Sequence, residues 1–162
     1  MALEWREVTL LELRSGLLSV TDPMLYPGLQ IELFPGTYRV SVGIQNVFGE
    51  QVVARLRVIL PGAAVTSAAH IGEVVVDFGQ VTVGDSKEME VAGNTIRTPE
   101  DAQTRLDILA QPGQFGFVPW DLQRETTTPY VRTPEGDGEF SVFRLHDHEM
   151  RPVGVEIVFV DE

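Results

Sequence analysis

The chain has 162 residues, no cysteine and a formal net charge of −12, from 24 acidic and 12 basic residues. This length is typical of one domain, so we predict a single domain over 1–162 that buries about 68–70% of the surface of its unfolded chain. The absence of cysteine excludes disulfides and thiolate metal sites, and the acidic excess disfavours binding to nucleic acid or anionic lipid, which requires basic surface.

The N-terminal part predicts short strands separated by turns. Apolar residues on both sides of Ser15-Gly16 indicate a strand or a turn-and-strand unit, which ends at Asp22-Pro23 because aspartate before proline favours a turn. Residues 22–28 hold two prolines and a glycine and therefore predict a loop. Ile31 and Leu33 then indicate a second short strand.

Residues 35–60 carry the clearest strand pattern in the chain. Apolar residues alternate with polar or small ones on both sides of a turn that contains Asn46 and Gly49, which is typical of a β-hairpin. Because a slip of one residue would set apolar side chains against arginines, the pattern favours one pairing. We predict that Ile44 lies opposite Val52, Val42 opposite Ala54, Val40 opposite Leu56 and Tyr38 opposite Val58.

The segment that follows predicts a loop and then strands. Residues 63–72 are small and polar and indicate a surface loop. Three valines at 74–76 and two more at Val81 and Val83 predict two short strands, or one strand with a bulge at Gly79.

One short α-helix is predicted near 99–110. Thr98 is a suitable N-cap, Pro99 occupies the first helical position, and Asp101 completes a pattern close to a capping box. Apolar residues recur at helical spacing as far as Leu109, and Pro112-Gly113 ends the helix. Its single apolar stripe indicates packing on one face of a sheet.

The C-terminal part combines an irregular segment with a hairpin. Residues 112–138 mix glycine, proline and aromatic residues, which predicts an ordered loop over part of the core. Strands are predicted over 140–145 and 153–160, with Phe143 opposite Val155 and Leu145 opposite Val153. Since both faces of the last strand are mostly apolar, we expect it to be central and covered on both sides.

These elements predict a mainly β fold. The expected arrangement is an antiparallel, two-layer β-sandwich-like structure or a partly closed barrel, with one helix covering an edge or a face. Strands do not alternate regularly with helices, which excludes a doubly wound or barrel α/β fold.

Three segments together carry a resemblance. They are Ser15-Gly-Leu-Leu-Ser-Val-Thr-Asp-Pro23, Pro35-Gly-Thr-Tyr-Arg-Val40, and Gly136-Asp-Gly-Glu-Phe-Ser-Val-Phe143 followed by Val153-Gly-Val-Glu-Ile-Val-Phe159. In this order they resemble a widespread bacterial family of unknown function with a similar Ser-Gly-x-Leu start and a Gly-Asp-Gly-x-aromatic motif. The resemblance implies a single bacterial domain and supplies no catalytic residue.

His146-Asp147-His148-Glu149 is the candidate metal site. Two histidines at i and i+2 of a strand face the same side, and a carboxylate could complete the ligand set. The alternative is that these polar residues solvate the turn between the last two strands, since a third strong ligand would have to come from His70 or a distant acid.

Three aspartates and two arginines are further candidate site residues. Asp77, Asp85 and Asp137 lie near glycines and turns, so they are turn formers or, alternatively, acids that converge in a cleft at the sheet end. Arg39 and Arg57 are expected opposite each other on the polar face of the hairpin. They would form either a small anion site or, with acids such as Glu32 or Glu73, a salt-bridged sheet face.

The sequence contains few of the motifs that identify an enzyme or a cofactor-binding protein. No nucleophile elbow, phosphate loop or dinucleotide fingerprint is present, and the sequence implies no cofactor. The N-terminus lacks the features of a signal peptide and no apolar run reaches the roughly 20 residues of a membrane span, which predicts a soluble cytoplasmic protein. We therefore expect a non-catalytic binding domain for a basic protein partner, in the manner of an immunity protein, with an enzyme or a metal-binding module at His146 and His148 as alternatives.

Overall fold

The fold consists of two antiparallel sheets in a computed structural model that describes residues 3–94, 96–110, 113–121 and 123–161. Within these residues there are eleven strands and two helices. The six-stranded sheet has the order β1 (Glu4–Leu13), β4 (Gly36–Val47), β5 (Glu50–Ile59), β11 (Pro152–Val158), β10 (Gly138–His146), β6 (Ser67–Val76). The five-stranded sheet has the order β3 (Leu29–Glu32), β2 (Leu17–Thr21), β7 (Gln80–Asp85), β9 (Thr127–Arg132), β8 (Phe115–Pro119). The predicted mainly β, sandwich-like class is confirmed.

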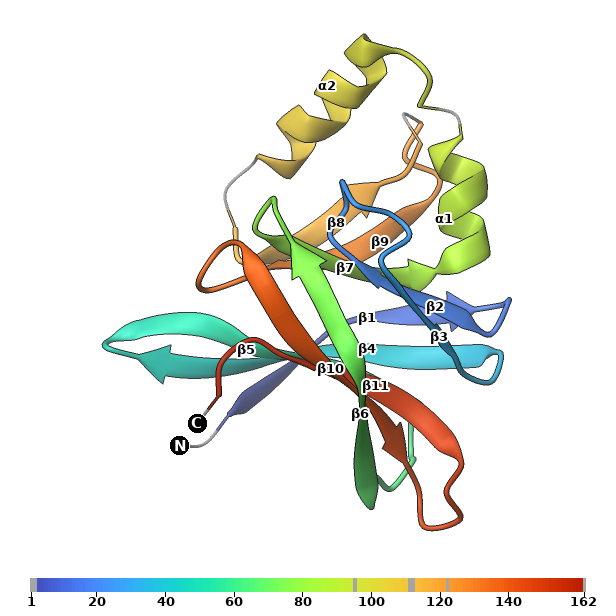
Figure 1. Cartoon of the computed structure of the whole chain (residues 1–162), viewed down its shortest axis with the longest axis vertical. Helices are drawn as coiled ribbons and strands as arrows, with labels where there is room; N and C mark the ends of the chain where they lie inside the picture. Colours follow the sequence, from blue (N-terminus) through green and yellow to red (C-terminus); the bar gives the residue numbers. More distant parts are fainter. Residues whose placement is uncertain (1–2, 95, 111–112, 122, 162) are drawn as a thin grey trace.

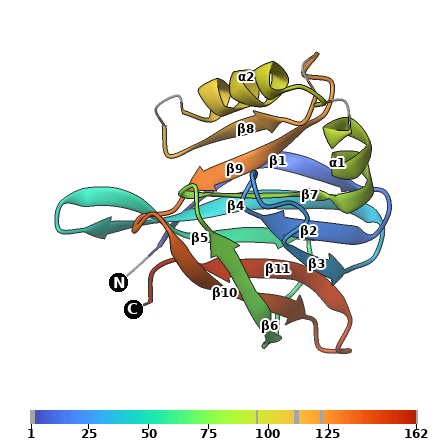
Figure 2. The ribbon, with the colours of Figure 1, turned by 45° about the horizontal axis from the view of Figure 1, so that its top comes forward.

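The core lies between the two sheets, and a second apolar cluster lies under the helices. Alternate residues of the six-stranded sheet, such as Val40, Val42 and Ile157, pack with Val20 and Val83 of the five-stranded sheet. The helices α1 (Ser86–Gly93) and α2 (Pro99–Leu109) lie on the outer side of the five-stranded sheet (Figures 1 and 2). Strand β7, between the two clusters, is buried along its whole length.

The helices match the prediction in part. Helix α2 begins as expected, with the Thr98 hydroxyl accepting the Asp101 N–H at 3.1 Å and Asp101 returning a bond to the Thr98 N–H. Helix α1 was not predicted. The sequence predicts a turn at Asp85, which is the N-cap of this helix, and only Met89 and Ala92 of its short sequence form a buried apolar face. Eight residues with two such positions leave little helical periodicity to detect.

The central hairpin forms, but its predicted pairing was wrong by two residues over most of its length. Val40 lies opposite Val58 and Val42 opposite Leu56, with a bulge between Gly43 and Ile44. The strands continue to Val47 and Glu50, so the connection is only two residues long. A shift of two residues keeps the same side chains on the core face, so the apolar alternation could not distinguish the two pairings.

The last hairpin also differs from the prediction, here by one residue. Phe143 lies opposite Glu156, and Leu145 opposite Gly154. At the turn His146 lies opposite Pro152, which continues the predicted pairing, and a register shift between Leu145 and His146 displaces the rest of the strand by one residue. Strand β11 is central, as predicted, but arginine side chains rather than another layer cover the outer side at Glu156.

Two predicted loops contain strands. Strand β6 begins at Ser67, where a surface loop over 63–72 was expected, and β8 and β9 lie in the expected loop over 112–138. The exposed residues of edge strand β6 include Ala68 and Ala69, which have low strand propensity. In these segments sheet pairing overrides local propensity.

No helix in the described ranges is long and apolar enough to cross a membrane.

Candidate functional site

The aspartates singled out in the sequence lie in separate places. Asp77 and Asp137 lie at one end of β10, since Gly138 pairs with Val76, and both side chains are exposed. His146 lies at the other end of this nine-residue strand, which at 3.3–3.4 Å per residue is roughly 27 Å away. Asp85 ends β7 in the other sheet. The structure therefore brings Asp77 and Asp137 to one edge and does not place the other candidates beside them.

Asp85 is buried and fully engaged with the backbone. Its carboxylate accepts the N–H groups of Lys87 at 3.0 Å and Glu88 at 3.1 Å, which caps α1. The other oxygen accepts the Ser15 N–H at 2.7 Å, so the same side chain fixes the β1–β2 turn. The role of Asp85 in the fold is thus to hold two turns together.

A second buried aspartate, Asp22, was not among the sequence candidates. It is fully buried, and its carboxylate accepts the N–H of Met24 at 2.8 Å, of Asp77 at 3.0 Å and of Phe78 at 2.7 Å. Asp22 therefore joins the loop after β2 to the β6–β7 turn. Burial lowers the pKa of Arg105, and the Asp22 charge counteracts this shift.

Two further aspartates have the same role at other turns. Burial raises the pKa of Asp121, but N–H groups of Glu125 and Thr126, at 2.9 and 2.8 Å, outweigh burial and leave this pKa below its ordinary value. Burial also raises the pKa of Asp147, and hydrogen bonds from the Arg151 backbone, the Arg151 side chain and the Glu149 N–H lower it further than burial raises it.

These lowered pKa values predict acid sensitivity. A carboxylate with a folded-state pKa below its unfolded value stabilises the fold above the unfolded pKa of about 3.9, and this stability is lost as pH falls through the folded pKa. We expect the free energy of unfolding to fall below about pH 4, and to fall less steeply in the Asp121→Asn, Asp147→Asn double variant. Urea denaturation between pH 3 and 7 measures both slopes, and identical slopes would contradict the assignment.

The two candidate metal-binding histidines differ in environment. His146 is buried and its Nε2 accepts the Arg144 Nε–H at 3.3 Å, while its Nδ1 has no hydrogen-bond partner in the described part of the chain. The side chain of His148 is 72% exposed, and its Nε2 lies 3.8 Å from Glu149 Oε1. Strand β10 ends at His146, so the two-residue alternation assumed for the pair does not continue. In the described part of the chain, no three histidine, aspartate or glutamate side chains are placed to hold one ion.

Arg39 and Arg57 do not lie opposite each other, contrary to the prediction. Arg39 pairs with Ile59, and Ser41 with Arg57, because of the two-residue difference in hairpin pairing. Arg39 Nε lies 3.4 Å from Glu7. The acids suggested from the sequence, Glu32 and Glu73, are not those that pair with the arginines.

Arg57 instead belongs to a charged cluster on the outer face of the six-stranded sheet. Glu156 accepts Arg55 Nη1 at 2.7 Å and Arg57 Nε and Nη2 at 2.9 and 2.5 Å. The Arg57 guanidinium also stacks on the Trp5 ring at 4.5 Å. The Glu156 side chain is 7% exposed, against 27% for Arg55 and 33% for Arg57. The salt-bridged sheet face is therefore present, with Glu156 as its buried acid.

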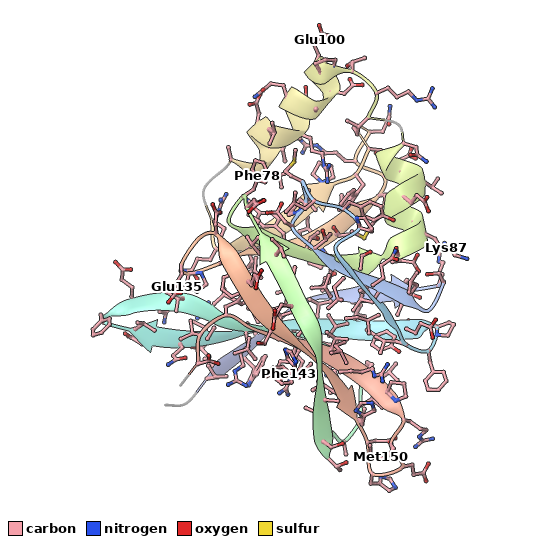
Figure 3. All side chains as sticks on the ribbon, in the orientation of Figure 1. Phe78, Lys87, Glu100, Glu135, Phe143 and Met150 are labelled. Carbon is pink, nitrogen blue, oxygen red and sulfur yellow. The ribbon has the colours of Figure 1, made fainter. Side chains whose placement is uncertain are left out.

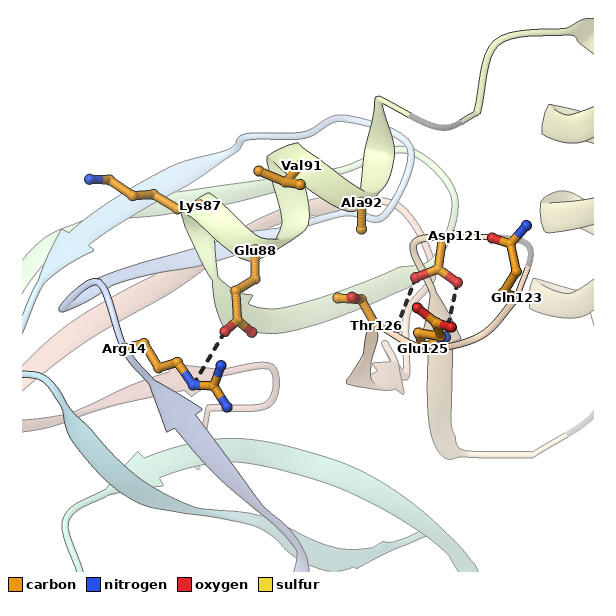
Figure 4. Close-up of a pocket in the computed structure, with 9 residues that line it drawn as sticks. All are labelled: Arg14, Lys87, Glu88, Val91, Ala92, Asp121, Gln123, Glu125 and Thr126. Carbon is orange, nitrogen blue, oxygen red and sulfur yellow. Dashed lines mark hydrogen bonds and ion pairs between the residues drawn. The ribbon is translucent and has the colours of Figure 1, made fainter.

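A pocket lies between α1 and the turn after β8 (Figure 4). Glu88 and Arg14 face each other there, with Glu88 Oε1 3.7 Å from Arg14 Nε. Asp121 lines the pocket, but its carboxylate accepts the N–H groups of Glu125 and Thr126. Two of the acids that line this pocket, Glu88 and Asp121, are thus engaged with arginine and with the backbone, respectively.

A groove of about 370 Å³ lies at the tip of the β4–β5 hairpin, beside the turn after β9. Phe48 at the tip is fully exposed and has a positive φ of 51°. Glu135, in the turn after β9, lines the other side of the groove (Figure 3). The sequence did contain a signal, because phenylalanine precedes Gly49 where asparagine or aspartate is typical of a two-residue turn.

Comparisons with models of known protein families, with characterised proteins and with solved structures found no match to this chain.

Proposed function

We propose that this chain is a non-catalytic domain that binds a protein partner with basic charge. The observation that supports the proposal is Phe48, which is fully exposed at the end of a hairpin that projects beyond the rest of the molecule (Figure 1). An aromatic side chain contributes to stability when it is buried, and this side chain is not.

The backbone conformation of Phe48 is a second reason to expect a contact with another molecule. A residue with a side chain at positive φ is strained by about 1 kcal/mol or more, and asparagine or glycine would fit with less strain. Phe48 therefore combines a strained backbone with an unburied ring. A contact with another molecule would bury the ring and account for its presence.

The charge of the chain supports a basic partner. A net charge of −12 attracts positively charged surfaces and speeds their association. The buried aspartates of the turns accept backbone N–H groups, as described for Asp22 and Asp85, and so give no sign of acid–base chemistry. Neutralisation of a basic toxin, as expected for an immunity-like protein of a bacterial family, is one form of this function.

The test is co-purification of the tagged chain from its native host at low and high salt. We expect a stoichiometric basic protein that is retained at low salt and released at high salt, because screening weakens contacts between exposed charges. Recovery of no partner, or of an acidic partner insensitive to salt, would contradict the proposal.

A further inference from the structure

We infer that the groove beside Phe48 docks an extended segment of the partner in which an apolar side chain is next to lysine or arginine. This inference rests on the proposed function and assigns its contact surface. The proposed occupant is a basic and apolar peptide segment, which the apolar lining and the acidic charge of the groove favour.

The walls of the groove are apolar and come from three parts of the chain. Val47, Phe48 and Val52 belong to the hairpin, Pro134 to the turn after β9, and Val160 follows β11. Apart from Phe48, these residues are partly buried and line the floor and sides. A volume of about 370 Å³ is at the small end of ligand pockets and suits one or two side chains rather than a folded domain.

The charged side chains that line the groove are acidic. Glu50 and Glu135 line it from two different elements and both are exposed, and no lysine, arginine or histidine of the described residues lines it. Two carboxylates beside an apolar floor favour a cation adjacent to an apolar group. A second copy of the chain would place glutamates against glutamates, which disfavours self-association through this surface.

The tip is held in shape before any partner arrives. Asn46 Oδ1 accepts the Gly49 N–H at 2.9 Å across the turn. Gln114 Nε2 donates to the Gln51 carbonyl at 2.5 Å, which ties the hairpin to the segment before β8. A surface fixed in this way loses little conformational entropy on binding.

The test compares two eight-residue peptides, one alternating lysine with leucine and one alternating glutamate with leucine, by NMR titration of the labelled chain. We expect the basic peptide to shift the amide signals of Val47, Val52 and Val160, and the acidic peptide to shift none. In Phe48→Asn, affinity for the basic peptide should fall about thirtyfold, as for a central aromatic contact. The urea midpoint of this variant should stay the same or rise, because asparagine tolerates positive φ.

Two controls make the outcomes distinct. Phe34→Ala removes another half-exposed phenylalanine, at the opposite end of β4, and should leave affinity unchanged. The double variant Glu50→Gln, Glu135→Gln should bind the basic peptide more weakly, and its binding should depend less on salt.

Equal binding of the basic peptide by wild type and Phe48→Asn, or no binding of it by wild type, overturns the site. If Phe48→Asn still retains the native-host partner, the site fails and the proposed function stands; if no partner exists, the function itself fails. A dimer that Phe48→Asn abolishes would overturn the basic occupant.

Discussion

Asp22→Ala should lower the free energy of unfolding by about 4 kcal/mol. The variant would leave the N–H groups of Met24, Asp77 and Phe78 without their acceptor, and each unsatisfied buried donor costs about 1–3 kcal/mol. It would also leave Arg105, whose guanidinium is partly buried against Trp120, without its opposing charge. Urea denaturation at neutral pH measures the loss.

Matched variants separate this effect from the loss of an exposed acid. Asp22→Asn keeps one acceptor oxygen and should lose about half as much, because some of the three hydrogen bonds remain. Asp77→Ala removes an exposed side chain and should change stability by less than about 0.5 kcal/mol. A loss below about 1 kcal/mol for Asp22→Ala would show that this carboxylate does not hold the two turns.

Glu156→Ala should lower the free energy of unfolding by about 3 kcal/mol. Removing one partner of a buried ion pair costs about 3–5 kcal/mol, and the partial exposure of Arg55 and Arg57 places this case at the lower end. Glu156→Gln keeps an acceptor but loses the charge, so its loss should be smaller. Thermal and urea unfolding measure both.

Glu149→Gln is the control for this second variant. Glu149 pairs with Arg151 at 3.2 Å, but both side chains are 58% exposed, and exposed ion pairs contribute about 0–1 kcal/mol. Equal losses for Glu149→Gln and Glu156→Gln would contradict a special role for the buried acid on the outer sheet face.

The fold class was predictable because alternation of side chains is a local property. Residues 38–44 and 52–58 show it clearly, and both form strands of the central hairpin. The pairing was not predictable, because the bulge at Gly43 and the two-residue turn at Phe48-Gly49 change register by two while leaving the core face intact. Residues of β6, β8 and β9 form strands because they pair with neighbouring strands of the sheets, which local sequence does not reveal.

The roles of the polar residues depended on distant partners and were less predictable. Asp22-Pro23 indicated a turn, as found, but nothing local showed that Asp22 would accept N–H groups 55 and 56 residues away. Glu156 resembled any polar residue of a strand, and its partners Arg55 and Arg57 are about a hundred residues earlier. The sheet order alone brings these groups together.

Cross-linking in the native host tests the proposed binding of a basic partner through the hairpin tip. Phe48 is replaced by photoreactive benzoylphenylalanine, and Phe34 is replaced in the same way as the control. We expect one basic protein to be captured at position 48 and not at position 34, and we expect Phe48→Asn to retain it no longer. Capture of the same proteins at both positions, or of none at position 48, would contradict the proposed binding.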